Sequence, residues 1–223
     1  MLLSLDSSAV TASVALTDGQ KIINNEFLNS GLTHSETLMP MVKRVMNGLD
    51  YSDLDAIAVN VGPGSFTGIR IGVAAAKGIA FVNNTPCIAV STLEAIAYNF
   101  VDTDCIVCAV MDARRMQFYN ALFRVRGKKI QRICDDRAIS IEDLSRDIAK
   151  YDNVIIAGDG AMLCCENLST DNFKLADENL VYQNALGVAM AAENKKEVSH
   201  TQLVPVYLRP SQAERELKLK RGV

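Results

Sequence analysis

A glycine-rich segment at residues 62–68, Gly-Pro-Gly-Ser-Phe-Thr-Gly, is the part of the chain whose residue types most directly suggest chemistry. It follows an apolar run and precedes a helix-like run at residues 66–82, so it indicates a strand–turn–helix junction whose free backbone N–H groups attract anions. A P-loop needs Lys and then Ser or Thr after its last glycine, but an isoleucine and Arg70 follow here. A dinucleotide-binding motif needs a third glycine where Thr67 stands. We therefore expect neither phosphate-binding motif.

The helix expected at residues 66–82 carries its smallest side chains every four residues. That spacing places them in one row, along which another helix can approach closely: Gly68, Gly72, Ala76 and Ala80. The other faces are also apolar, which indicates a helix covered on nearly all sides. The cover is either the protein's own lobe or a partner protein. With the adaptable apolar surface of the preceding helix, at residues 33–49, we predict a partner interface of Met39, Val42, Met46, Gly68, Arg70, Gly72 and Ala76.

The six cysteines and two histidines are the candidate ligands for a soft metal. Cys105 and Cys108 form a CxxC pair inside a strand-like run, where residues three apart point to opposite faces. Disulfide frameworks are usual only in small secreted chains. We therefore expect all six thiols to be reduced and mostly buried. His34 and His200 are far apart in sequence, and we predict no metal site. For His34, at the start of a helix, we favour a local hydrogen bond or a partner contact over a general-base role.

Composition narrows the class of protein. Of 223 residues, 49% are hydrophobic and 22% charged, so we expect a sizeable core and no extensive disorder. The formal net charge is −3 and the pI about 5.5, which argues against nucleic-acid binding through bulk electrostatics. The most apolar stretch contains Arg70 and Lys77 and would make a poor membrane span. We find no targeting segment, and we expect a soluble, cytoplasmic protein that does not bind a membrane.

The two halves of the chain show the same order of expected elements. The first half contains strands at residues 2–5, 12–16 and 21–28, a helix at 33–49, a strand at 55–61, the helix at 66–82, a strand at 86–90 and a helix from 91 to about 100. The second contains strands at 105–111, 117–125 and 128–134, a helix at 140–150, a strand at 154–157, a helix at 182–193 and a strand at 204–208. The predicted fold is α/β, with two βββαβα lobes around mixed central sheets, and we place the domains at residues 1–103 and 104–223.

An aspartate ends the first strand of each half: Asp6 and Asp112. This duplicated unit resembles the actin-like ATPase (ASKHA) superfamily, an RNase H-like fold in which paired lobes clamp a nucleotide and such aspartates hold magnesium or activate water. Here residues 7–11 contain no glycine, so side chains intrude where phosphates would lie. The resemblance implies at most a weak nucleotide site at Asp6, Ser8, Thr11 and Asp112. Alternatively, the two aspartates only cap strand ends and hold the hairpins.

Longer motifs make the resemblance specific. Residues 61–72, Val-Gly-Pro-Gly-Ser-Phe-Thr-Gly-Ile-Arg-Ile-Gly, together with Asp6-Ser7-Ser8 and His34-Ser35-Glu36, resemble the bacterial TsaB (YeaZ-type) family. Matching segments continue to about residue 210. The resemblance implies an accessory subunit in the synthesis of threonylcarbamoyladenosine in tRNA. Such a subunit pairs with the catalytic paralogue TsaD, enables binding of the ATPase TsaE, contacts tRNA only through the complex, and forms a homodimer when alone.

The same resemblance bears on catalysis. TsaD binds its metal through a His-x-x-x-His motif, and alignment places those two positions at Thr92 and Ile96, which do not suit a divalent transition metal. The resemblance therefore implies a non-catalytic subunit without a metal or cofactor of its own, apart from weakly bound ATP or ADP at the complex interface. Two alternatives stay open: a small actin-like kinase or ATPase that uses Asp6 or Asp112, and a tRNA-binding module. A contact between the tRNA backbone and the basic residues of the tail, at 211–223, is a further alternative.

Overall fold

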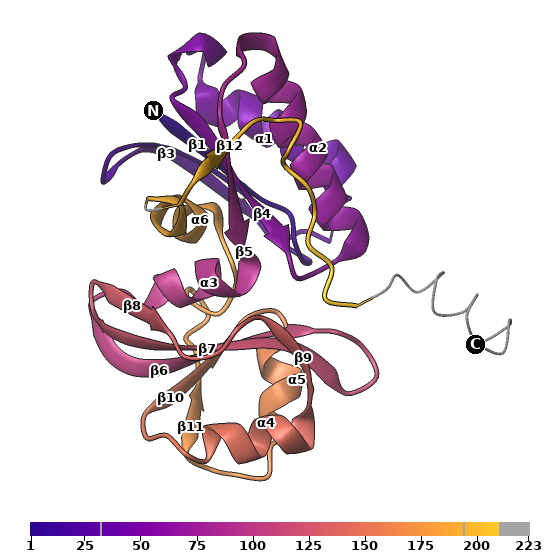
Figure 1. Cartoon of the computed structure of the whole chain (residues 1–223), viewed down its shortest axis with the longest axis vertical. Coiled ribbons are helices and arrows are strands. Elements are labelled where there is room, and N and C mark those ends of the chain that lie inside the picture. The colour runs from indigo at the N-terminus through magenta and orange to yellow at the C-terminus, as the bar shows by residue number, and fades with distance from the viewer. Residues whose placement is uncertain (32, 194, 210–223) are drawn as a thin grey trace, which may run out of the picture.

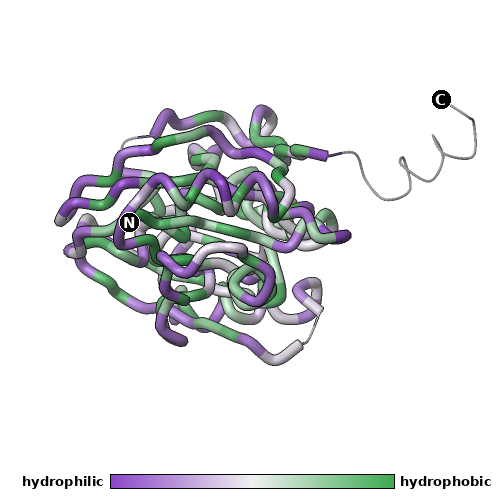
Figure 2. The backbone as a smooth tube through the Cα atoms, turned by 90° about the horizontal axis from the view of Figure 1, so that it is seen from below, coloured by the Kyte–Doolittle hydropathy of each residue, from purple (hydrophilic) through white to green (hydrophobic). Residues whose placement is uncertain are grey.

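Apolar runs separated by turn residues build two lobes, each around one mixed sheet (Figure 1). The computed structural model describes residues 1–31, 33–193 and 195–209. The basic tail at residues 211–223 lies outside them. Figure 2 shows hydrophobic residues along the strands that cross the middle of the molecule and many hydrophilic residues along the outer turns. In the described part of the chain, no helix is long and apolar enough to cross a membrane.

The first sheet has the strand order β12-β5-β4-β1-β2-β3. β1 is antiparallel to β2 and parallel to β4, which is in turn parallel to β5. β4 is buried along its whole length, as expected for an inner strand that is covered on both faces. The strands are β1 (Leu2–Asp6), β2 (Ala12–Asp18), β3 (Lys21–Leu28), β4 (Ala56–Gly62), β5 (Cys87–Ser91) and β12 (Glu197–Val198).

Helices cover both faces of this sheet. α1 (His34–Met46) and α2 (Phe66–Asn83) pack on one face, and α3 (Thr92–Ala97) and α6 (Ala185–Ala192) pack on the other. α1 continues through Pro40, and the hydroxyl of Ser65 caps α2 by accepting from the N–H of Gly68 (3.3 Å). Short 3-10 turns at Tyr51–Asp53 and Tyr98–Phe100 complete this part of the chain.

The second sheet has the order β11-β10-β6-β7-β8, and β9 pairs with β7. α4 (Ile141–Ile148) and α5 (Ala161–Cys165) lie on its outer face, while α3 lies on its inner face, between the two sheets. The strands are β6 (Thr103–Asp112), β7 (Gln117–Gly127), β8 (Lys129–Arg132), β9 (Arg137–Ser140), β10 (Val154–Ala157) and β11 (Phe173–Leu175).

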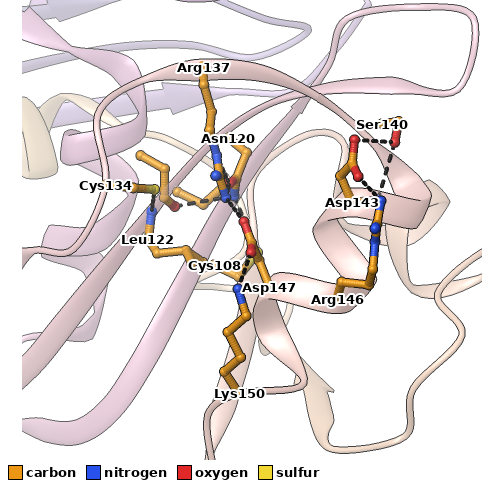
Figure 3. A network of polar contacts seen from close by, with 12 residues as sticks. Cys108, Asn120, Leu122, Cys134, Arg137, Ser140, Asp143, Arg146, Asp147 and Lys150 are labelled. Carbon is orange, nitrogen blue, oxygen red and sulfur yellow. Dashed lines mark hydrogen bonds and ion pairs between the residues drawn. The ribbon is translucent and has the colours of Figure 1, made fainter.

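A polar network fixes the short strand β9 to β7 (Figure 3). The buried Asn120 donates to the carbonyl oxygens of Ala109 (3.0 Å) and Ala121 (3.3 Å) and to the sulfur of Cys108 (3.4 Å). Its own side-chain oxygen accepts from the guanidinium of Arg137 (3.0 Å and 3.2 Å). Each group of this buried amide is therefore hydrogen-bonded, as a folded interior requires.

The predicted fold class is confirmed, but the chain does not divide as predicted. Residues after 103 build the second sheet until about residue 181, and the chain then returns to the first lobe, where α6 covers its sheet and β12 pairs with β5. The described residues after 103 therefore do not form one unit. The predicted strand at 204–208 is also wrong, because this segment has one backbone hydrogen bond to β4, from the N–H of Val206 to the carbonyl of Val61 (2.8 Å). The predicted helix start at 182 shifts to Ala185, since the Asn184 side chain caps it.

Candidate functional site

The loop between β1 and β2 packs directly against the N-terminus of α2. The Ser7 hydroxyl donates to the carbonyl of Gly68 (2.9 Å), and the backbone N–H of Ser65 donates to the carbonyl of Ser8 (2.7 Å). A methyl group at position 68 would overlap the carbonyl oxygen of Ser7, and one at Gly72 would lie 2.6 Å from the Ser7 hydroxyl. Only glycine allows the helix to lie this close to the loop.

This packing corrects the predicted role of the small-residue row. Gly68, Gly72 and Ala76 are buried and belong to the face of α2 that packs on the protein's own lobe. They hold the helix against that lobe and do not offer a surface to a partner. Periodicity places residues on one side of a helix, but it does not say whether that side faces inward.

The predicted contribution of α1 needs a similar correction. Val42 and Met46 are buried in the core of the first lobe, with 0% and 2% exposure. Met39 is 43% exposed, and Arg70 on α2 is also exposed. Of the seven residues predicted for the interface, these two lie at the surface.

The outward face of α2 carries residues that sequence reasoning missed. At the C-terminal end of α2, Phe81 is 69% exposed and Val82 is 74% exposed. The Phe81 ring makes a T-shaped contact with the His200 ring, with the ring centroids 5.6 Å apart. Closer to the N-terminus, the exposed positions follow helical spacing: Thr67, Arg70, Ala74 and Gly78. Because Ala74, Gly78, Phe81 and Val82 on this exposed face are also apolar, the sequence pattern did not distinguish it from the buried face.

Asp6 is enclosed rather than presented to a ligand. Its Oδ1 accepts from the Ser8 hydroxyl (2.6 Å), the Ser8 backbone N–H (3.2 Å) and the Asn60 amide (2.7 Å). Burial raises the pKa of this carboxyl, although its hydrogen bonds act in the opposite direction. Asp6, Ser8 and Thr11 are all 0% exposed. The structure therefore does not bring these three residues of the predicted nucleotide site to a surface.

His34 is also occupied locally. Its Nε2 lies 2.5 Å from the carbonyl oxygen of Ala9, in the same loop between β1 and β2. This contact, to a residue 25 positions earlier in the chain, ties the start of α1 to that loop.

A cleft of about 530 Å³ lies between the two lobes. Its walls are the tip of the loop between β1 and β2, the N-terminus of α2, the end of β6 and residues 206–209. Asp112 lines this cleft, alone among the four residues of the predicted nucleotide site. Its carboxylate accepts from the backbone N–H of Arg114 (2.6 Å) and from the guanidinium of the same residue (3.1 Å).

Asp159, in the turn after β10, also lines the cleft. Burial raises the pKa of its carboxyl to about 7, and the nearby carboxyls of Asp112 and Asp6 add to this rise. Its Oδ1 is shielded and has no hydrogen-bond partner among the described residues. Asp159 is not among the site residues predicted from the sequence.

Besides the packing of α3 against both sheets, the polar contacts that join the lobes include two sets. The first is an ionic cluster beside α3, in which Glu94 accepts from Arg132 (3.2 Å) and Lys195 (2.8 Å), and Arg132 also pairs with Asp136. The second is the C-terminal strap, which we define as residues 203–209. Arg209 at its end donates to the carbonyl oxygen of Ala113 in the second lobe (3.0 Å).

The strap is held to α2 by a stack of side chains. The Tyr207 ring stacks on the Phe66 ring, with the ring centroids 4.7 Å apart. The Arg70 guanidinium lies over the Phe66 ring, 4.0 Å from its centroid. Arg70 Nε also donates to the Tyr207 hydroxyl (3.0 Å), and Lys77 donates to the carbonyl of Leu203 (3.2 Å). The strap thus connects the first lobe, along α2, to the second.

The chain is similar in sequence to known proteins along most of its length. The family model of TsaD, the tRNA N6-adenosine threonylcarbamoyltransferase, matches residues 28–162. The tRNA threonylcarbamoyladenosine biosynthesis protein TsaB of Bacillus subtilis is 32% identical over 157 residues, which cover 70% of this chain and 69% of that protein. The chain belongs to the TsaB family. TsaB of Haemophilus influenzae is 38% identical over 124 residues, or 53% of this chain and 51% of that protein.

A solved TsaB-type structure supports the same assignment. YeaZ from Pseudomonas aeruginosa matches with a TM-score of 0.80 and 27% identity, over 93% of this chain and 99% of that one. The predicted resemblance to the TsaB family is confirmed, as is the actin-like fold.

Within this TsaB-family fold, Thr92 and Ile96 are core residues. Both are 0% exposed on α3, between the two sheets. Among the described residues, no three His, Cys, Asp or Glu side chains are grouped so that they could hold a metal ion. All six cysteines are free thiols, and burial raises the pKa of Cys164 to about 12.

Proposed function

We propose that this TsaB-family chain is a non-catalytic scaffold and activator subunit of the complex that transfers a threonylcarbamoyl group to the adenosine next to the tRNA anticodon. In this complex it pairs with a TsaD-type catalytic subunit and enables binding of a TsaE-type ATPase. It contacts tRNA only within the complex, which acts in the cytoplasm. The family membership supports the process, and the features below support the role within it.

The exposed outer face of α2 is the observation that carries the pairing. Phe81 and Val82 are large apolar side chains with most of their surface in water, and Ala74 and Gly78 leave a flat path beside them. Met39 on the neighbouring α1 adds further apolar surface. Exposed apolar surface of this kind is typical of protein–protein contacts. In the absence of the catalytic subunit, a second copy of the chain uses the same face as a homodimer.

The contacts between the lobes support a scaffold over a nucleotide-driven hinge enzyme. The ionic cluster around Arg132 and the C-terminal strap connect the lobes at different places, so opening the cleft would break both. Asp6, one of the two aspartates that the kinase alternative could use, is enclosed, and so are Ser8 and Thr11 of the predicted nucleotide site. Any bound ATP or ADP is therefore weak and lies at the complex interface.

The test is assembly with a TsaD-type subunit, measured by calorimetry. Phe81→Glu places a charge on the proposed contact face and should weaken the complex at least tenfold, because that charge would be desolvated without a partner. Met162→Glu is the matched control, since Met162 is 60% exposed on α5 of the other lobe. Equal affinity of the two variants would show that the contact face is elsewhere. Threonylcarbamoyl transfer by the reconstituted complex should follow the assembly data, and the chain alone should have no transfer activity.

A further inference from the structure

Arg114 and Arg209 line the cleft between the lobes. Arg70 contacts Phe66 and Tyr207, which also line it, and Arg115 follows Arg114 in the same exposed turn. We call Arg70, Arg114, Arg115 and Arg209 the arginine rim. Contacts connect its members: Arg70 bonds to Tyr207 of the strap, and the strap ends at Arg209, which bonds to the carbonyl oxygen next to Arg114. Residues from α2, from the turn between β6 and β7 and from the strap thus come together only in the folded protein.

The charges of the rim are largely uncompensated. Among the described residues, Arg70, Arg115 and Arg209 form no ion pair with a carboxylate. Arg114 pairs with Asp112, but its side chain remains 83% exposed. Asp159, the other carboxyl at the cleft, has its Oδ1 shielded from solvent. In a chain of net charge −3, this is a local site of positive potential.

The turn that presents two of these arginines is strained. Arg114, Arg115 and Met116 have φ values of 66°, 58° and 55°, in the left-handed region that residues with a Cβ rarely occupy. All three residues are exposed, so burial does not offset this cost. Strain held at an exposed position is a feature of binding and switch sites. Here the turn places Arg114 in the lining of the cleft and keeps the adjacent Arg115 exposed.

An aromatic surface accompanies the charges. Tyr207 is 41% exposed, although one face of its ring lies on Phe66. Arginines recognise phosphate oxygens through paired N–H groups, and an exposed aromatic ring can stack with a nucleobase. Arginines together with an exposed ring suit RNA better than an acidic protein, which would use the charges alone.

We propose that the arginine rim and Tyr207 contact the phosphate backbone and an unstacked base of the tRNA, within the assembled complex. The inference rests on the proposed function, because the complex brings the tRNA to this chain. The acidic remainder of the protein explains why the rim acts within the assembly and not as a free-standing RNA-binding module.

The test measures binding of a labelled, unmodified tRNA by fluorescence anisotropy, using the full chain assembled with its TsaD-type subunit, from 0.05 to 0.2 M salt. Arg114→Gln with Arg115→Gln removes two charges at exposed positions. Arg126→Gln with Lys129→Gln is the matched control, because this exposed pair lies at the other end of β7. Assembly of both variants with the catalytic subunit is measured separately.

The rim variant should assemble normally and bind tRNA roughly tenfold more weakly at 0.15 M salt, with the slope of log K against log salt reduced by about 1.5. The control should bind like the unmodified chain. Equal tRNA affinity of the rim variant and the control would overturn the inference, and so would weaker tRNA binding that is fully accounted for by a loss of assembly in the rim variant. Failure of the unmodified chain to assemble would instead refute the proposed function.

Discussion

Asp159 makes the stability of this protein depend on pH near neutrality. Burial, with the carboxyls of Asp112 and Asp6 nearby, raises its pKa from 3.8 to about 7. Between these two values the folded chain holds a proton that the unfolded chain has released. Stability is therefore highest below about pH 4 as far as this group is concerned, and it falls as pH rises toward 7. The rise in pKa corresponds to at most about 4 kcal/mol.

Replacement of Asp159 by Asn removes this titration while keeping the shape and an acceptor oxygen for the backbone N–H of Asp112. We expect Asp159→Asn to match the unmodified chain near pH 4 and to exceed its free energy of unfolding at pH 8 by about 2–4 kcal/mol. Urea unfolding at pH 5, 6, 7 and 8 measures the difference, in which the contributions of other titrating groups cancel. Asp152→Asn is the control, because Asp152 is exposed in the same lobe.

The decisive quantity is how the stability difference between Asp159→Asn and the unmodified chain changes with pH. A difference that stays constant from pH 5 to pH 8, or an asparagine variant that is the less stable protein at pH 8, would refute the claim that Asp159 is a proton-binding group in the cleft. A pH-dependent gain of the same size in Asp152→Asn would refute it equally, since that gain would come from net charge alone.

Two further predictions concern packing. Gly72→Leu should lower the free energy of unfolding in urea by about 3 kcal/mol or more, because the leucine side chain would meet Ser7. Gly78→Leu is the control and should cause no such loss, because nothing lies within 4 Å of a Cβ added there. Equal effects of the two changes would contradict the inward orientation of the small-residue row. Asn120→Ala should lower the free energy of unfolding by about 2–4 kcal/mol, because the buried acceptors and Arg137 lose their hydrogen-bond partner. Asn167→Ala, at an exposed position in the same lobe, is the control and should lower it by under about 1 kcal/mol. Similar losses in the two variants would show that the network in Figure 3 contributes little to stability.

Periodicity and turn residues in the sequence predicted the main strands and helices of both halves. The elements that it missed are short or lack a pattern: β9, β11, β12 and α5. β12 is a strand of two residues, and it is defined by its antiparallel pairing with β5. Residues 204–208 of the strap were mistaken for a strand because Val204 and Val206 are β-forming residues, and propensity cannot show whether a segment pairs with a sheet.

The sequence by itself determined the fold class, the family, and the existence of a nearly all-apolar α2. These are local properties, carried by residue spacing and by motifs within short segments. Only the tertiary structure decided which face of α2 is free, that Asp6 is enclosed, and that burial raises the pKa of Asp159 to about 7. It also decided that Arg114 and Arg209 line one cleft, beside the contacts of Arg70 with Phe66 and Tyr207. Orientation, burial and proximity depend on residues far apart in the chain, and side-chain spacing along one helix does not contain that information.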